Sequence, residues 1–427
     1  MHAPRAALLG IALMAAAAPL PAQTATSPRA QRVAGDVRYL ASDALAGRKT
    51  GEAGNDSAAQ FIARQLRALG LRPAGDSGTF FQRWTAGSSA ATRQAGIEGK
   101  AARNVVAVLP GAGRLAGQAV VLGAHFDHLG MGGMGSLNPD SVLVHNGADD
   151  NASGTAALLE AGRVMSAGRR PGPRDMRSVV FVFFSGEEQG TLGSTWYTNH
   201  PAAPMDSTIA MVNFDMVGRL REGKLLALGA RSATEWQALI DSVNQAARLD
   251  VRASGDGWGP SDHAPFFAQH RPVLHLFTDL HEDYHRPSDD APAINADGIV
   301  QVADFAVQLA QRLRARSSGL TFVDAPPPAP PVAASGARPS LGTIPDMTDE
   351  PGGVRLSGVR AGSPAEAGGL RQGDILTGMG THTIADLQDF QNALMAHRPG
   401  QQVEIRFKRG EQNMSVMVTL GGAAPRN

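Results

Sequence analysis

The sequence predicts an α/β fold, in which a doubly wound, mostly parallel mixed sheet has helices on both faces, followed by a small β-rich domain. From residue 104 onward, short apolar segments alternate with longer segments of helical periodicity. Several short segments are apolar throughout, which is typical of strands whose sheet is covered on both faces. A proline-rich segment near residue 330 separates a second alternating region.

The individual elements follow from these patterns. Ser27-Pro28 is a typical helix start, and that helix is expected to run to about Ala46. After a loop at 47–51, a second helix ends at Gly70, and residues 87–99 form a loop or a strand crossover. Strands are expected at 105–109, 119–123, 179–184, 209–214, 225–228 and 273–277, and helices at 155–166, 192–199, 234–247 and 297–316.

Composition limits the classes of function. A length of 427 residues suggests two or three domains, and 39 basic residues balance 39 acidic ones. No electrostatic footprint for nucleic acid or an anionic membrane is present. The chain has no cysteine, so any metal must be held by His, Asp and Glu.

The N-terminus predicts export. Residues 1–22 read as a signal peptide: His2 and Arg5 form a basic start, residues 8–18 are apolar, and PLPA at 19–22 offers a small-residue cleavage site. The apolar run is too short to span a bilayer, and no cysteine is present for a lipid anchor. A buried N-terminal helix would need a polar face, which this segment lacks. We expect a periplasmic or secreted protein.

Three further segments complete the predicted organisation. Residues 27–322 form the main domain, and residues 323–339, rich in proline and alanine, form a semi-stiff linker. Residues 340–421 form the small domain, with a helix at 383–397 that opens on Thr383 with Asp386 three residues later.

Two adjacent carboxylates, Asp149 and Asp150, stand in the segment VHNGADDNASG, where a helix should begin. Carboxylates this close repel one another, so they are best tolerated where a cation is bound. The pair therefore indicates a metal, with Asp150 as the residue that bridges two ions.

Other strand ends carry further ligand types: His125 and Asp127, the pair Glu187-Glu188, Asp215 and His285. Singly each is ambiguous, since a lone histidine is usually a hydrogen-bonded core residue and a Glu-Glu pair a solvated helix start. Together they predict one metal site at the carboxyl edge of the sheet. His125 and Asp127 share a face of an extended segment, so Asp127 can accept the other ring N–H of His125.

The motifs AHFDH, GADDNASG, FSGEEQGTLGS, NFDMVG and YHRPSD resemble the secreted dizinc aminopeptidases, which are bacterial leucyl aminopeptidase-like and related to glutamate carboxypeptidases and glutaminyl cyclases. The resemblance covers about residues 38–313 and implies a zinc-peptidase, phosphorylase/hydrolase-like fold. It implies His125 and Asp215 on one zinc, Glu188 and His285 on the other, and Asp150 bridging both. It also implies Glu187 as general base, Asp127 as the partner of His125, and Tyr284 near the developing oxyanion.

The chemistry expected of such a site is hydrolysis from the N-terminus of a peptide. A water shared by two zinc ions loses its proton to Glu187, which passes it to the departing amine. A metal and Tyr284 stabilise the oxyanion. A free α-amine could sit against the metals and their carboxylates.

The small domain resembles a PDZ domain of the permuted type attached to bacterial proteases, through SLGTI and GSPAEAGGLRQGDIL. This implies a carboxylate-binding loop at Leu341, Gly342, Thr343 and Ile344, which holds the C-terminus of an extended peptide. The alternative is a domain that only packs on the main one.

Several weaker signals have simple structural interpretations. Gly130 to Gly135 matches G-x-G-x-x-G, but the residues after it cannot open the helix that a dinucleotide site requires, so it is interpreted as a loop beside the active site. Asp262 and His263 are assigned structural support, and Trp258 lines a pocket or fills the core. His145, His275 and His281 are interpreted as packing or surface residues.

Three other functions remain open on the sequence. A glutaminyl cyclase would use one zinc, a carboxypeptidase would add an arginine-lined carboxylate pocket, and a non-catalytic protein would use only its PDZ domain. The expected partners are peptides with a free N-terminus and peptide C-termini, without nucleic acid or a membrane span.

Overall fold

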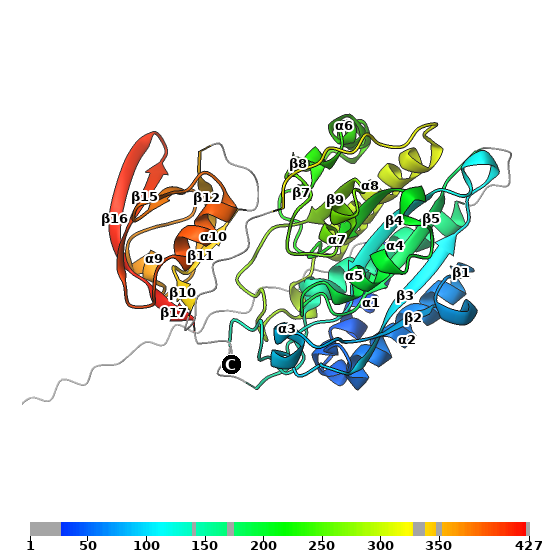
Figure 1. The fold of residues 1–427 in the computed structure, drawn as a ribbon, viewed down its shortest axis with the longest axis horizontal. Helices are drawn as coiled ribbons and strands as arrows, with labels where there is room; N and C mark the ends of the chain where they lie inside the picture. Colours follow the sequence, from blue (N-terminus) through cyan, green and yellow to red (C-terminus); the bar gives the residue numbers. More distant parts are fainter. Residues whose placement is uncertain (1–26, 139–141, 169–174, 328–337, 347–351, 424–427) are drawn as a thin grey trace, which may run out of the picture.

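The structure is a computed structural model and describes residues 27–138, 142–168, 175–327, 338–346 and 352–423 (Figure 1). The predicted signal peptide and most of the predicted linker lie outside these ranges. Within them, no helix is both long and apolar enough to cross a bilayer.

A nine-stranded sheet forms the centre of the larger part, in the order β1-β3-β5-β4-β6-β9-β7-β8, with β2 also paired to β3. Pairing is parallel at the centre (β5-β4-β6-β9) and between β7 and β8, and antiparallel elsewhere, so the predicted mixed sheet is confirmed. The strands are β1 Arg72–Pro73, β2 Phe81–Thr85, β3 Ala101–Leu109, β4 Ala119–His125, β5 Ser178–Phe184, β6 Thr208–Phe214, β7 Lys224–Leu228, β8 Asp250–Ser254 and β9 Val273–Phe277.

Helices cover both faces of this sheet (Figure 1). Successive residues of β5 show why: Phe181 packs into the core shared with one group of helices, and Val182 into the core that holds Tyr197 and Phe266. The first group is α1 Pro28–Leu40, α2 Ala53–Ala68, α4 Gly154–Ala167, α6 Trp236–Ala247 and α8 Ala296–Ala315; the second is α5 Leu192–Asn199 and α7 Ala264–Ala268.

The structure corrects the predicted end of the first helix. It ends at Leu40 rather than near Ala46, because Ala41 leaves the helical conformation with φ of −97° and ψ of 31°. Residues Asp43–Arg48 form a separate short 3₁₀ segment, in which Ala46 and Gly47 have φ of 46° and 68°. Residues 87–99, expected as a loop or crossover, contain the short helix α3 Ala90–Gln94, which Ser89 caps through the backbone N–H of Thr92. Strand β8, at the sheet edge, lacks the apolar run that would have predicted it.

The smaller part has its own core, which includes Leu356, Leu376, Phe390 and Ile405. Its sheet has the order β11-β12-β13-β15-β16, with β14 paired to β13, and β10 pairs separately with β17. The elements are β10 Arg338–Ser340, β11 Thr343–Pro345, β12 Val354–Val359, α9 Pro364–Ala367, β13 Ile375–Met379, β14 His382–Thr383, α10 Leu387–Met395, β15 Gln402–Arg409, β16 Gln412–Thr419 and β17 Gly421–Ala423.

The helix predicted at 383–397 begins later, at Leu387. Its cap is Asp386, whose side chain accepts a hydrogen bond from the backbone N–H of Asp389, whereas Thr383 belongs to β14. The sequence pattern placed Asp386 inside the helix, three residues after a start at Thr383. In the structure Asp386 is itself the residue that caps the start of the helix.

The first residues of the predicted linker pack on the larger part. The backbone N–H of Val323 donates to the Ser232 carbonyl at 2.9 Å, and the indole N–H of Trp258 donates to the Ala325 carbonyl at 3.0 Å. Trp258 therefore anchors the chain as it leaves the larger part.

Candidate metal centre

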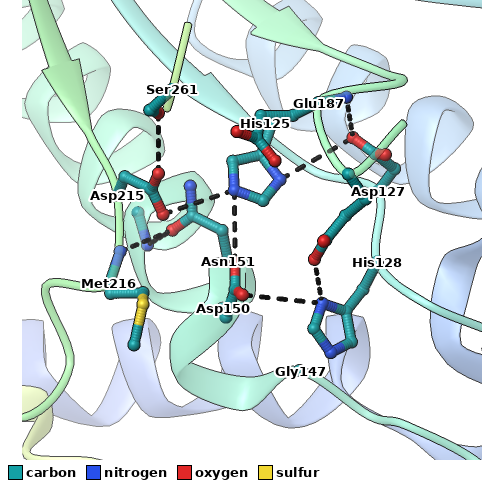
Figure 2. A network of polar contacts seen from close by, with 12 residues as sticks. His125, Asp127, His128, Gly147, Asp150, Asn151, Glu187, Asp215, Met216 and Ser261 are labelled. Atoms are coloured by element: carbon teal, nitrogen blue, oxygen red, sulfur yellow. Dashed lines mark hydrogen bonds and ion pairs between the residues drawn. The ribbon is translucent and has the colours of Figure 1, made fainter. Parts of the chain in front are cut away.

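The predicted ligands meet at the carboxyl edge of the central sheet, and Figure 2 shows three of them, His125, Asp150 and Asp215. His125 ends β4, Glu188 follows β5, and Asp215 follows β6. Asp150 lies in the turn that precedes α4, between these strand ends, and is 4% exposed. The parallel central strands bring these ends together because they all point the same way.

His125, Asp150 and Asp215 form one candidate ligand set. His125 Nε2 lies 3.3 Å from Asp150 Oδ1 and 3.3 Å from Asp215 Oδ1. The other Asp215 oxygen accepts a 2.7 Å hydrogen bond from Ser261 Oγ, which fixes the carboxylate (Figure 2). One donor atom from each of the three converges within 4.8 Å.

Asp150, Glu188 and His285 form a second set. His285 Nε2 lies 3.0 Å from Asp150 Oδ2 and 3.2 Å from Glu188 Oε2. Asp150 thus turns one oxygen to each set. The structure brings together all five residues that the sequence suggested as ligands.

His128 joins the second set, although no role was predicted for it. Its Nδ1 lies 2.6 Å from Glu188 Oε1, and it can share a metal with Asp150 and Glu188. The ring is fully buried, and its Nε2 has no hydrogen-bond partner among the described residues. The signal was its place in AHFDH, but β4 ends at His125, so strand alternation could not orient it.

The glycine-rich segment 130–135 holds His285. The Gly135 carbonyl accepts a 2.8 Å hydrogen bond from His285 Nδ1, and Leu137 N–H donates to the His285 carbonyl at 3.0 Å. His285 itself has a φ of 55°, a conformation that this loop helps to maintain. The segment is a loop at the site, as expected, and the described residues that follow Gly135, 136–138, do not open a helix.

Asp127, Glu187 and Tyr284 surround the two sets. Asp127 Oδ1 is 3.7 Å from His125 Nδ1, which is longer than a hydrogen bond, and it accepts from the Glu187 backbone N–H at 3.2 Å. Asp127 therefore ties the β5 end to the β4 end while facing the His125 ring. The Tyr284 ring stacks on the His285 ring at 3.9 Å between centroids.

Asp149 has a separate task from its neighbour. Its Oδ1 accepts from Gly218 N–H at 2.6 Å and from Ser153 Oγ at 2.8 Å, and its Oδ2 lies 3.1 Å from His281 Nε2. Asp289 Oδ2 accepts the backbone N–H groups of both Asp149 and Asp150. His281, expected to be a packing or surface residue, is instead the partner of this buried acid.

A buried arginine, Arg48, binds the loops around the site. Its guanidinium donates to the carbonyls of Leu40, Phe126, Asn146 and Gly147. Burial lowers the pKa of Arg48 to about 10, against the opposing charges of the nearby carboxylates. This side chain fixes the backbone just before Asp150.

The electrostatics separate the two glutamates. Burial raises the pKa of Glu187 well above its usual value, helped by the charge of Glu188 and opposed by His125. Burial acts the same way on Glu188, but the charge of His285 outweighs it and lowers the pKa of Glu188 to about 2. Glu187 is thus the better proton acceptor of the pair.

Asp262 and His263 lie in the same region. Burial raises the pKa of Asp262 to about 7, and both of its oxygens are buried. The His263 ring lies 4.7 Å from that of His275, and burial lowers the pKa of both histidines. These three residues are interior groups, and no candidate ligand set includes them.

The donor set fits zinc. Among the described residues, no lysine or arginine pairs with the carboxylates of Asp150, Glu188 or Asp215, and buried carboxylates without such partners are costly unless a cation is bound. Imidazole nitrogens and carboxylate oxygens, without sulfur, are ligands that zinc accepts. A shared carboxylate between two such sets is an arrangement for two ions.

In the smaller part, the predicted carboxylate-binding loop runs into the edge strand β11. Leu341 is buried in the small core, and Gly342 has a φ of 77°, so its backbone favours glycine. Thr343 and Ile344 begin β11, which among the strands of the described residues pairs only with β12. The other edge is where a peptide strand could add.

Comparison with known proteins gives two family matches. The sequence model of peptidase family M28 matches residues 104–310, and that of the PDZ domain matches residues 339–420.

A probable leucine aminopeptidase of Arthroderma otae is 31% identical over 168 residues, 38% of this chain and 42% of that protein, so the chain spans about two fifths of this relative. A zinc aminopeptidase from Bacillus subtilis has a similar fold, with a TM-score of 0.51 and 17% identity over 69% of this chain and 98% of that one. Glutaminyl cyclase of Porphyromonas gingivalis also has a similar fold, with a TM-score of 0.50 and 19% identity over 66% of this chain and 96% of that one.

Proposed function

Residues 104–310 belong to peptidase family M28 and residues 339–420 are a PDZ domain, and on this premise we propose that the protein is an exported, zinc-dependent aminopeptidase. It removes the N-terminal residue of peptides. The observation that carries the proposal is Asp150, which offers one oxygen to each of two ligand sets beside Glu187. Export is supported by the N-terminal sequence pattern of residues 1–22.

Five residues would hold two zinc ions: His125 and Asp215 on one, Glu188 and His285 on the other, and Asp150 on both. Bound there, the ions would supply Lewis-acid activation of a water and of the substrate carbonyl. Asp127 faces the His125 ring, and Asp289 holds the backbone that carries Asp150 by accepting hydrogen bonds from the N–H groups of Asp149 and Asp150.

Glu187 acts as the general base. It takes a proton from the attacking water and passes it to the departing amine, which the raised pKa of this buried carboxyl favours. Its backbone N–H is fixed by Asp127, so the side chain starts from a defined position. Tyr284, stacked on His285, donates its hydroxyl hydrogen to the developing oxyanion.

The substrate's free α-amine supplies the specificity for N-termini. As a cation it is attracted by the carboxylates gathered at the site, which a blocked N-terminus cannot match. The PDZ domain would bind the C-terminus of an extended peptide at Leu341, Gly342, Thr343 and Ile344, through strand addition at β11.

Replacing Glu187 by Gln tests the assignment. The variant should keep both metals and lose at least 100-fold in kcat, because general base catalysis contributes roughly 10²–10⁴-fold. Metal content and hydrolysis of free and N-acetylated peptides are measured together, with the exposed Glu98→Gln as control. Near wild-type turnover would remove Glu187 as the base, and equal cleavage of the N-acetylated peptide would exclude an aminopeptidase.

A further inference from the structure

Both oxygens of the Asp127 carboxylate have a hydrogen-bond donor. Oδ1 accepts the Glu187 backbone N–H at 3.2 Å (Figure 2), and Oδ2 lies 3.1 Å from Thr50 Oγ1. A carboxylate can only accept, so the Thr50 hydroxyl is the donor. Asp127 is therefore held by the end of β5 on one side and by the loop at residues 47–51 on the other.

Thr50 is a fully buried side chain in a segment that the sequence predicts only as a loop between two helices. Its hydroxyl oxygen also lies 3.0 Å from Ser185 Oγ, which donates to Asn55 Oδ1 at 3.1 Å. Asn55 Nδ2 in turn donates to the Arg48 carbonyl at 3.0 Å. Because these contacts connect Thr50 to the end of β5 and to α2, its hydroxyl is held in one place.

This loop is also bound to the turn that follows β4. The His128 N–H donates to the Arg48 carbonyl at 3.4 Å, and the Gly130 N–H donates to the Gly47 carbonyl at 3.1 Å. A Cβ on Gly47 would overlap the Gly130 carbonyl oxygen, so the two segments are in close contact. The loop is therefore fixed against the same turn that supplies the acceptor of the Thr50 hydroxyl.

Asp127 is a buried acid, and among the described residues no lysine or arginine forms an ion pair with it. A carboxylate without water needs hydrogen bonds in its place, and those to a charged acceptor are the stronger ones. Thr50 and the Glu187 N–H supply them. Since Oδ1 also lies 3.7 Å from His125 Nδ1, the plane of this carboxylate determines where the acceptor of Glu187 lies relative to the His125 ring.

We propose that Thr50 is a positioning residue of the metal centre, whose hydroxyl fixes the plane of the Asp127 carboxylate. With Oδ2 held by Thr50, Oδ1 stays at the Glu187 backbone N–H and opposite the His125 ring. Without the hydroxyl the carboxylate can rotate, and the segment that carries Glu187 and Glu188 loses a fixed point. The effect of Thr50 on catalysis rests on the proposed aminopeptidase function, whereas its effect on metal binding does not.

Thr50→Val tests this role, because it removes the hydroxyl and keeps the shape of the side chain, while Thr50→Ser restores the hydroxyl. The matched control is Thr208→Val. Thr208 is equally buried and donates to the Pro204 carbonyl at 3.3 Å, but it begins β6, at the opposite edge of the sheet from the metal centre. The full-length proteins are loaded with zinc, and chelator competition gives the zinc affinities, alongside kcat and KM for a free peptide. Thermal unfolding confirms that each variant is folded, and Thr50→Cys, whose thiol is a weaker donor, replaces a valine variant that does not fold.

Thr50→Val should weaken zinc binding by His125 and Asp215 and lower kcat, each by roughly 10-fold, as is usual for groups that hold a ligand in place. KM should change little. Thr50→Ser should recover most of both losses, and Thr208→Val should behave as the wild type. In an Asp127→Ala background, Thr50→Val should have no further effect, because the group through which it acts is gone.

Unchanged zinc affinity and kcat in Thr50→Val would overturn the inference. Equal losses in Thr50→Val and Thr50→Ser would do the same, since they would assign the effect to packing rather than to the hydroxyl, as would a full further loss in the Asp127→Ala background. If the wild type binds two zinc ions but cleaves no free peptide, the proposed function fails, while the order of the zinc affinities still decides the role of Thr50.

Discussion

At the scale of single residues, His128 belongs to a motif that was recognised in the sequence, but its contact with the metal centre was not predicted. AHFDH contains two histidines, and alternation along a strand singles out only His125 because β4 ends there. His128 reaches the site through the turn that follows, where its Nδ1 meets Glu188 at 2.6 Å. Because this contact holds the Glu188 carboxylate in place, less conformational freedom is lost when a metal binds to it.

Replacing His128 by Ala should weaken one of the two bound metals by roughly 10–100-fold, as is usual for residues that hold a ligand in place. The metal shared by His125 and Asp215 should be affected less. Competition with a zinc chelator measures both affinities, and His200→Ala, an exposed histidine, is the control. His128→Gln, which keeps a hydrogen-bonding group, should recover part of the loss; unchanged affinities in both variants would contradict this role.

Residue types near strand ends, together with the resemblance to dizinc aminopeptidases, named His125, Asp150, Glu188, Asp215 and His285 as candidate ligands, and the structure brings these side chains together. The partners that orient them were less accessible. The contact between His281 and Asp149 joins residues that lie 132 positions apart in the sequence. Such pairs depend on how loops fold over the sheet edge, which local periodicity does not encode.

At the scale of elements, the turn from Gly147 to Ser153 places Asp150. Gly147 has a φ of 55°, and a Cβ on it would overlap the Asp150 carbonyl oxygen and the His128 ring. The sequence pattern indicated a helix start here but not this irregular turn before α4. The sequence also did not indicate the helix end after Leu40, because the residue at that end, Ala41, is of a type that favours helix.

Gly147→Ala should therefore destabilise the protein and disturb metal binding. The matched control is Gly70→Ala, which has a similar φ of 66° but no atom within 4 Å of the added Cβ. The control should cost only the backbone strain of about 1–2 kcal/mol, and Gly147→Ala clearly more. Urea unfolding gives both values, and equal losses would show that the close contact is relieved without cost.

At the scale of the whole molecule, two domains with separate cores contact each other through polar side chains such as Lys224 and Asp346. The metal centre is built by the larger domain, and Asp279, on the segment that leads from β9 to His285, accepts a hydrogen bond from Ser357 of the PDZ domain. Composition and the proline-rich segment predicted two units from the sequence. Their mutual placement depends on side-chain pairs such as Lys224 with Asp346, which no sequence pattern indicates.

Lys224→Met should loosen this placement with little effect on the unfolding free energy. Partly exposed ion pairs contribute at most about 1 kcal/mol, so the change appears in domain orientation rather than in stability. Small-angle X-ray scattering should show a larger radius of gyration, and Lys408→Met, an exposed lysine of β15, should not. An unchanged scattering profile would mean that other contacts suffice to hold the domains together.

The carbonyl of Gly135 also decides the tautomer of His285. A carbonyl can only accept, so Nδ1 must carry the ring proton, and the lone pair of Nε2 is left pointing at Asp150 and Glu188. A loop that resembles a nucleotide-binding motif thus sets the protonation pattern of a candidate metal ligand 150 residues away. Shortening or redesigning that loop to alter substrate access would also change the chemistry of the metal centre.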